Sequence, residues 1–202
     1  MDINKVLKKQ RKSYVRFMLS MGFIFLLLPM VLWLTKQITT FFLGYLVVIE
    51  VLILALMIMR YNEEYLKSEL VNDKIAISML GGRVKYKISY SKVALVHTIQ
   101  HEKYFDILIV TKSNFRNKRM RVVTKKALEK YSEIEKHYRK INMPESGSYY
   151  YFIVRRGGAK KYLLLDLLYK YSVSAIFTEN AVKHIKEYRN LNTLQRKNSK
   201  TE

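Results

Sequence analysis

Two apolar runs near the N-terminus dominate the hydropathy pattern of the chain. Residues 17–34 carry no charged side chain, and residues 38–59 carry only Glu50. At about 1.5 Å per residue, each run approaches the roughly 30 Å hydrocarbon thickness of a bilayer. Only residues 35–37 separate them. The pattern therefore predicts a transmembrane hairpin over residues 17–60, with helices at about 17–35 and 38–59.

The period of the pattern changes after the second run. Residues 61–71 keep a helical spacing and predict a helical linker. Beyond residue 72, apolar and polar side chains alternate in short runs that are typical of strands, and Gly-Gly pairs at 81–82 and 157–158 predict turns. The predicted strands cover residues 75–79, 84–88, 92–99, 104–111, 119–123, 148–154 and 160–165.

Two stretches of the soluble part have helical rather than strand periodicity. Between residues 125 and 141, apolar side chains recur every three or four positions, which predicts a helix packed on a sheet. A second helix is expected after Thr178, which is a good N-cap residue. The sequence thus predicts an α+β membrane protein in which residues 72–194 form an antiparallel β domain with an inserted and a C-terminal helix. Residues 195–202 are expected to form a flexible tail.

The order of these elements resembles a known domain type. In the run NDKIAISMLGGRVKYKISYSKVALV, residues 72–96, a strand, a glycine turn and a basic strand precede a Tyr-Ser-Lys-Val step. This is similar to a pleckstrin-homology-like (PH-like) domain. Together with the preceding hairpin, it looks like the bacterial membrane proteins of the YcxB-like type, in which a strand and a helix also close the chain. The resemblance implies a PH-like domain on the cytosolic side, with the helix at 125–141 as an insertion.

Charge gives the expected orientation in the membrane. The formal net charge is +21; residues 1–60 carry 8 of the 37 basic and 2 of the 16 acidic side chains, which leaves 29 and 14, a net charge of +15, for residues 61–202. Residues 1–16 form a basic flank, whereas the hairpin turn carries only Lys36. The positive-inside rule therefore predicts a multi-pass protein of the plasma membrane with both termini in the cytoplasm.

Basic side chains of the soluble part fall into three clusters, which we interpret as contacts with anionic membrane lipids or a membrane partner. The alternative is that they serve solubility and protect strand edges. The sequence argues against nucleic acid as a partner, because no helix-turn-helix, RNP-like or zinc-knuckle motif occurs. The clusters consist of Arg83, Lys85 and Lys87; of Arg116, Lys118, Arg119, Arg121, Lys125 and Lys126; and of Arg155, Arg156, Lys160 and Lys161.

Catalytic chemistry has little support in the sequence. The absence of cysteine excludes disulfides, thiolate metal sites and cysteine nucleophiles. His97 and His101 are four residues apart, about 13 Å on a strand, which is too far for one metal ion. Glu133 and His137 share a helix face but have no nucleophile to activate. We therefore predict a non-enzymatic protein with no cofactor and no metal.

Glu50 is the only charged residue in either span, where a carboxylate costs at least about 2.5–3.5 kcal/mol. It predicts either an ion relay or, as we favour, a carboxyl that hydrogen-bonds across the hairpin or within a homo-oligomer. The leading hypothesis is a membrane protein whose basic domain contacts anionic lipid or a membrane partner. The alternatives are a bacteriocin immunity protein and an accessory subunit of a transporter or secretion complex, with Glu50 against a partner helix.

Overall fold

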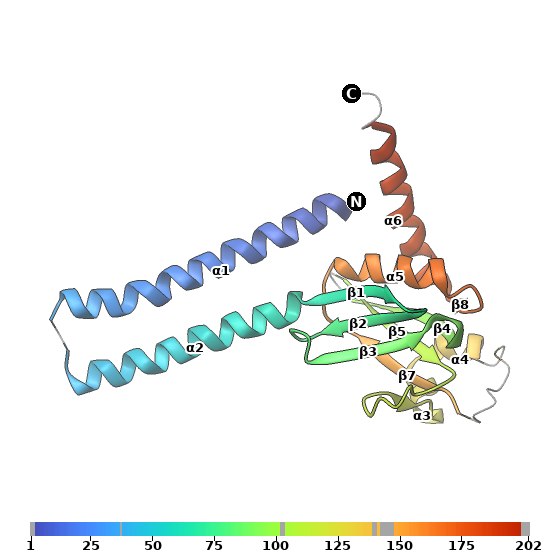
Figure 1. The fold of residues 1–202 in the computed structure, drawn as a ribbon, viewed down its shortest axis with the longest axis horizontal. Helices are drawn as coiled ribbons and strands as arrows, with labels where there is room; N and C mark the ends of the chain where they lie inside the picture. The colour runs from blue at the N-terminus through green and yellow to red at the C-terminus, as the bar shows by residue number, and fades with distance from the viewer. Residues whose placement is uncertain (1–2, 37, 102–103, 139–140, 142–147, 199–202) are drawn as a thin grey trace.

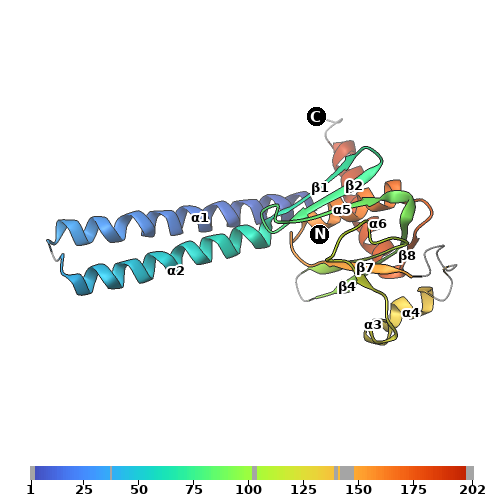
Figure 2. The ribbon, with the colours of Figure 1, turned by 60° about the horizontal axis from the view of Figure 1, so that its bottom comes forward.

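A long helical hairpin carries an α+β domain at one end in the computed structural model of the chain (Figure 1). The structure describes residues 3–36, 38–101, 104–138, 141 and 148–198. Figure 2 shows that the domain sits beyond the end of the hairpin where α2 leads into β1. The hairpin consists of α1, Ile3–Leu34, and α2, Thr40–Glu64.

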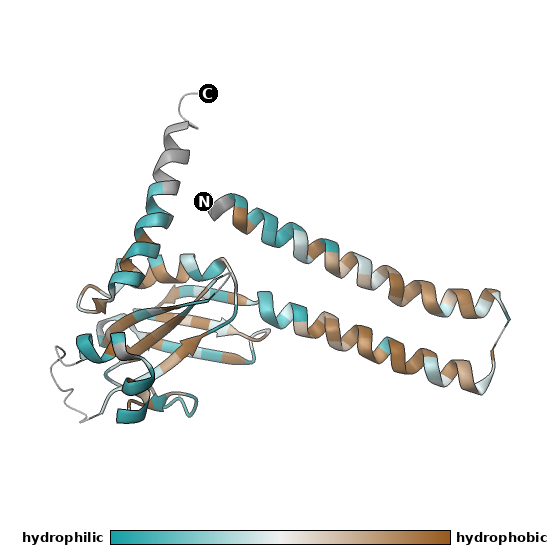
Figure 3. Ribbon diagram, turned by 180° about the vertical axis from the view of Figure 1, so that it is seen from behind, coloured by the Kyte–Doolittle hydropathy of each residue, from teal (hydrophilic) through white to brown (hydrophobic). Residues whose placement is uncertain are grey.

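Both hairpin helices are long and apolar enough to cross a membrane. In the most apolar window of α1 no residue is buried within the molecule, and in that of α2 only 6% are. The helices are therefore not core helices of the domain. Figure 3 shows that the apolar part of α1 lies toward the hairpin turn and its polar part toward the domain. Thr39 begins α2 by accepting a hydrogen bond from the Phe42 amide, and Gln37 in the turn lies outside the described residues.

The first sheet is a meander of three antiparallel strands that follows α2 directly. Apolar side chains on β2 and β3 alternate with exposed ones, which gives the sheet one buried face. A short 3-10 helix at Tyr90–Lys92 leads out of the sheet. The strands are β1, Leu66–Val71; β2, Lys74–Met79; and β3, Val84–Ser89.

The second sheet has five strands in the order β6-β7-β5-β4-β8, all antiparallel except for the parallel β4–β8 pair. Its two central strands are almost wholly buried because both faces are covered. The strands are β4, Val93–Gln100; β5, Phe105–Thr111; β6, Arg121–Val122; β7, Tyr150–Val154; and β8, Ile176–Phe177.

The main core lies between the two sheets and the helices α5 and α6. Strand residues such as Ile75, Ile88 and Ile107 meet Leu164 of α5 and Ile185 of α6 there. A second apolar cluster joins the outer face of β4 and β5 to α3 and α4. The helices are α3, Lys125–Lys130; α4, Ser132–Tyr138; α5, Lys160–Tyr171; and α6, Glu179–Asn198.

The structure confirms the α+β class with antiparallel sheets, and it corrects four predicted elements. The predicted helical linker 61–71 is helical only to Glu64, and residues 66–71 form β1. The predicted strand 160–165 belongs to helix α5. The predicted helix 125–141 is two helices that break at Tyr131. The predicted tail begins too early, since α6 continues to Asn198; residues 199–202 lie outside the described residues.

Physical reasons for two of these corrections are visible in the packing. The Tyr61, Tyr65 and Leu66 spacing mimics a helix, but Leu66 is 7% exposed, belongs to the core between the sheets and pairs with Met79 of β2. In α5, the fully buried Leu164, Leu165 and Leu168 follow the helical spacing of one, three and four residues. A short apolar run does not distinguish a strand from a buried helix.

Candidate functional site

The N-terminal end of α1, the C-terminal end of α2 and the α+β domain line a cavity of about 960 Å³, here called the junction cavity. Four segments of the chain form its wall: the first turns of α1, the end of α2, the β4–β5 connection and the β7–α5 turn. The lining residues are Val6, Lys9, Gln10, Ser13, Arg60, Glu63, Glu64, His101, Tyr104, Asp106, Arg155, Arg156, Gly157, Gly158 and Lys161.

The β7–α5 turn brings the domain against both hairpin helices. Gly157 and Gly158 have φ angles of 105° and 52°, a region that favours glycine. A Cβ atom on Gly157 would lie 2.4 Å from Leu66 Cβ, and one on Gly158 would lie 2.6 Å from Gln10 Oε1. The Gly-Gly pair predicted as a hairpin turn is thus a strand-to-helix turn that allows close approach.

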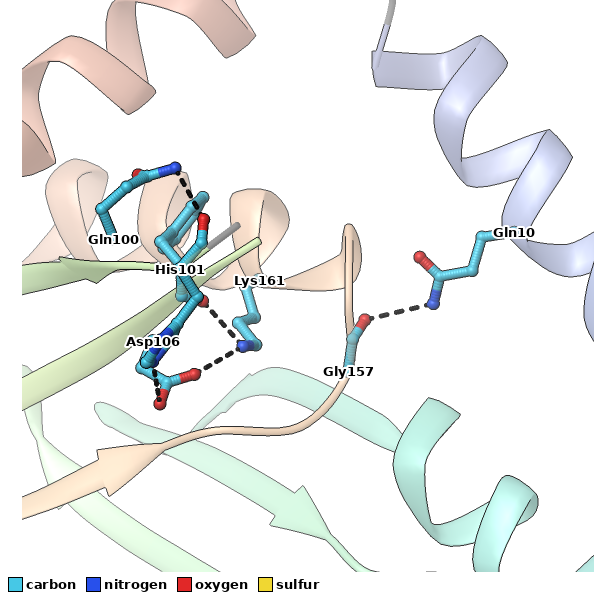
Figure 4. Close-up of polar contacts among 7 residues, drawn as sticks. Gln10, Gln100, His101, Asp106, Gly157 and Lys161 are labelled. Carbon is cyan, nitrogen blue, oxygen red and sulfur yellow. Dashed lines mark hydrogen bonds and ion pairs between the residues drawn. The ribbon is translucent and has the colours of Figure 1, made fainter. Parts of the chain in front are cut away.

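Gln10 of α1 binds this turn directly (Figure 4). Its Oε1 accepts a hydrogen bond of 2.8 Å from the Ala159 amide, and its Nε2 donates to the Gly157 carbonyl at 3.4 Å. The same Nε2 donates to the Glu64 carboxylate of α2. One side chain therefore joins α1, α2 and the start of α5.

The end of α2 adds two further hydrogen bonds to the same turn. The Gly157 amide donates to the Glu63 carbonyl at 2.9 Å. Lys160 Nζ donates to the Glu64 carbonyl at 2.9 Å, which satisfies one of the carbonyls left without a partner at a helix C-terminus. Predicted as a lipid contact, Lys160 is half-buried and already engaged within the chain.

Lys161 is buried within the domain, whereas the sequence predicted a surface contact with lipid or a partner. Only 3% of it is exposed, and its Nζ donates to the Phe105 carbonyl at 2.7 Å and to Asp106 Oδ1 at 2.9 Å. Asp106 Oδ2 lies 3.1 Å from His101 Nε2 (Figure 4). Burial lowers the pKa of the Lys161 ammonium from its ordinary value, against the opposing effect of Asp106.

Some of the remaining charged side chains of the junction cavity form ion pairs and others do not. Arg60 pairs with Glu63 at 3.6 Å and with Glu64 at 3.1 Å. The side chains of Lys9, Arg155 and Arg156 are exposed and make no ion pair or hydrogen bond within the described part of the chain. The carboxylates of the cavity are therefore engaged, while three cations are not.

A second group of cations gathers around β3, here called the basic surface. The Arg119 guanidinium donates to the Arg83 carbonyl at 2.9 Å, and Asn117 Nδ2 donates to the Lys85 carbonyl at 3.1 Å. Arg119 and Arg121 also lower the pKa of Tyr86 on β3, although burial raises it more. The basic surface comprises Arg83, Lys85, Lys87, Arg116, Lys118, Arg119 and Arg121, all of them exposed.

The basic surface begins beside the end of α2. The β2–β3 turn contacts that helix so closely that a Cβ atom on Gly81 would lie 2.9 Å from the Tyr61 ring. The structure thus brings two predicted clusters together, except for Lys125 and Lys126, which are exposed at the start of α3. Arg155 and Arg156 belong to the junction cavity instead.

Glu50 is half-buried on α2 and makes no hydrogen bond or ion pair with any residue that the structure describes. We predicted a hydrogen bond either across the hairpin or within a homo-oligomer; the first is absent from the described residues, and the second stays a prediction.

His97 and His101, which lie four residues apart in the sequence, each have a partner in the structure. His97 Nδ1 lies 3.1 Å from Thr178 Oγ1 and 3.8 Å from Glu133, which in turn accepts a hydrogen bond from Asn180. His101 faces Asp106. The two therefore face different neighbours.

Comparison with protein-family models, curated protein sequences and solved structures finds no match in any of the three. No relative decides the function. The PH-like and YcxB-like resemblance stays a prediction.

Sequence reasoning missed Gln10, Glu64, Asp106 and His101 as residues of the junction. The available signal was the Gly157-Gly158 pair, since a double glycine indicates close approach as well as a turn. The partners of that pair could not be predicted, because Gln10 is 147 residues away from Gly157.

Proposed function

We propose that this chain is a non-enzymatic integral membrane protein whose basic cytosolic domain contacts the anionic lipid of the inner leaflet. The hairpin crosses the bilayer twice, with both termini in the cytoplasm. Its apolar side chains support this, because they are exposed along both helices and contiguous exposed apolar surface of this size indicates a membrane or partner contact.

The observation that carries the proposal is the position of the basic surface. Its seven cations are exposed, and the surface begins beside the end of α2, where Gly81, two residues before Arg83, lies against Tyr61 just after the apolar run of that helix. Each Lys or Arg near an anionic leaflet contributes about 1 kcal/mol, falling off within about 10 Å at 0.1 M salt. Several such charges hold the domain flat on the membrane. The closing strand–helix pair β8–α6 supports the finer proposal of a PH-like domain.

The full-length protein in vesicles tests this proposal through single cysteines, which the native chain lacks. A fluorophore on Lys85→Cys reports the basic surface. The control is Val173→Cys, 88% exposed in the α5–β8 turn, which Figure 1 places at the end of the domain farthest from the hairpin.

We expect lipid-borne quenchers to quench the Lys85→Cys label more strongly in anionic than in neutral vesicles, and this difference to vanish in high salt. The Val173→Cys label stays unaffected by lipid charge. Equal quenching of the Lys85→Cys label in both lipids would contradict the lipid contact. Labelling of either cysteine by an impermeant reagent from the outside of intact cells would contradict the orientation.

A further inference from the structure

We propose that the junction cavity binds the phosphate-bearing head group of one anionic phospholipid. The inference deepens the proposed function and rests on its membrane orientation. It concerns a stoichiometric site, in contrast to the diffuse attraction of the basic surface. The ligand chemistry is a phosphate ester, which a lipid head group or a soluble phosphate compound can supply; we assign it to the lipid.

The charge of the cavity lining favours an anionic ligand. Lys9, Arg155 and Arg156 face the cavity without a partner among the described residues. The three cavity carboxylates have other partners, because Glu63 and Glu64 share Arg60, and Asp106 binds Lys161. With five cations and three carboxylates in its lining, the cavity offers an entering anion a net charge of +2 and three cations without an ion-pair partner among the described residues.

The chemistry of the lining side chains favours a phosphate ester. Arginine presents a planar fork of N–H donors that binds phosphate oxygens in a bidentate manner, so two adjacent arginines match one phosphate ester. The Ser13 hydroxyl adds a neutral donor from α1. The volume of about 960 Å³ suits a whole head group rather than a lone ion.

The position of the cavity along α2 favours a membrane lipid. Arg60 lines the cavity and directly follows Met59, the last residue of the apolar run on α2. The cavity thus begins where the hydrocarbon layer ends, at the level of lipid phosphates. A phospholipid reaches Arg60 and its neighbours with its acyl chains still in the bilayer.

The rigidity of the cavity wall also favours binding. Gln10, Glu64 and the Gly157-Gly158 turn hold the wall together through the hydrogen bonds described above. Arg155 and Arg156 directly precede this turn. The cations are therefore carried on a braced segment, which lowers the entropic cost of ordering them around a ligand.

Native mass spectrometry of the full-length protein in mild detergent tests the site. The probes are phosphatidylglycerol, phosphatidylcholine and inorganic phosphate. The test variant is Arg155→Gln with Arg156→Gln, and the matched control is Lys85→Gln with Lys87→Gln, which removes the same charge from the basic surface.

We expect one phosphatidylglycerol to be retained in preference to phosphatidylcholine by the native protein and by the control. The Arg155/Arg156 variant should bind it about tenfold more weakly or worse. Arg155→Lys with Arg156→Lys, which keeps the charge and loses the fork, should fall between the two. It also serves as the readout should the glutamine variant not fold.

Suppose that the native protein retains no lipid but binds inorganic phosphate, and that this binding is lost in the Arg155/Arg156 variant. This result would support the phosphate site and overturn its assignment to lipid. Equal retention of phosphatidylglycerol by the native protein and both arginine variants would overturn the site itself. The outcome is separate from that of the proposed function, because the quenching of the Lys85→Cys label reports the basic surface and not this cavity.

Discussion

Whether a lysine of this domain is buried or reaches the surface depends on partners that are distant in the sequence. In the sequence, Lys160 and Lys161 are alike, and both were predicted to face lipid. In the structure, Lys160 reaches the end of α2, whereas Lys161 is buried and binds Asp106 of β5. Hydropathy cannot distinguish the two positions, because the partner carboxylate is 55 residues away.

Lys161→Met is expected to destabilise the domain by about 3–5 kcal/mol, because it leaves the Asp106 carboxylate buried without its main partner. Urea unfolding of the detergent-solubilised protein, followed by tyrosine circular dichroism, measures the change. Lys160→Met is the control and should cost about 1 kcal/mol or less, the net value of one ordinary hydrogen bond. Adding Asp106→Leu to Lys161→Met should restore much of the lost stability. Equal effects of the two single variants would contradict this interpretation.

Two buried histidines predict a stability that depends on pH. Burial is the main cause that lowers the pKa of His97, near Glu133 and His137, and of His184, which stacks on Phe105 with ring centroids 4.2 Å apart. The folded state thus binds fewer protons than the unfolded chain below the ordinary value of 6.5. The stability that the two neutral histidines contribute is fully present above this pH, and it is lost as the pH falls toward their lowered pKa values.

The unfolding temperature should therefore drop between about pH 7 and about pH 5.5. Differential scanning calorimetry of the full-length protein measures it. Substituting both histidines, His97→Gln with His184→Gln, should reduce the slope, because neither side chain then takes up a proton on unfolding. Glu187 and Lys183 beside His184 remain in place. An unchanged slope in the double variant would assign the pH dependence to other groups.

At the scale of elements, most of the domain was predictable from local pattern. The alternation of Ile75, Ile77 and Met79, and of Val84, Tyr86 and Ile88, gave β2 and β3 because one face of that sheet is buried. The elements that failed were those whose pattern is ambiguous. Leu66–Val71 alternates poorly, and α5 presents a leucine run that suits either a strand or a helix.

The attachment of α1 to the domain gives a testable element-level prediction. Gly158→Ala places a Cβ atom against Gln10 at a φ of 52°, so the hydrogen bonds from Gln10 to Gly157 and Ala159 should be lost. The first turns of α1 then open to protease. Trypsin should cut after Lys8, Lys9, Arg11 or Lys12 severalfold faster in the variant, because the locally opened state that the protease attacks becomes more populated.

Gly22→Ala is the matched control, since a Cβ atom there meets nothing within 4 Å. It should leave the trypsin rate unchanged. Gln10→Ala should raise the rate as Gly158→Ala does, and the two changes together should not add, because both remove the same contacts. An additive double variant would show that Gly158 acts elsewhere.

For the whole molecule, the hydropathy pattern predicts the division into a hairpin and a domain, and only the Gly157-Gly158 pair signals a close approach between them. Composition separates residues 17–59 from the rest because bilayer and water select different side chains. The junction depends instead on single contacts between distant segments, such as Gln10 with Ala159, 149 residues apart. No local pattern encodes such a pair.

Glu50 gives a prediction for the assembled molecule, since it lacks a partner among the described residues of its own chain. We infer that its carboxyl hydrogen-bonds to a second copy of the chain in the membrane. Glu50→Leu should reduce crosslinking between copies about threefold or more. Glu50→Gln should retain it, because an amide still forms a hydrogen bond, and Val51→Leu should have no effect. Undiminished crosslinking of Glu50→Leu would remove this interpretation.

The bonds between Gln10 and residues 157–159 also impose an order on biosynthesis. The ribosome makes α1 and α2 first, and at about 5–20 residues per second the 147-residue interval to Gly157 takes roughly 7–30 s. During that time the hairpin can enter the translocon with its basic flank unrestrained. If the hairpin inserts as we propose, insertion precedes docking, and a transcript broken before codon 157 yields a product in which Gln10 never binds residues 157–159.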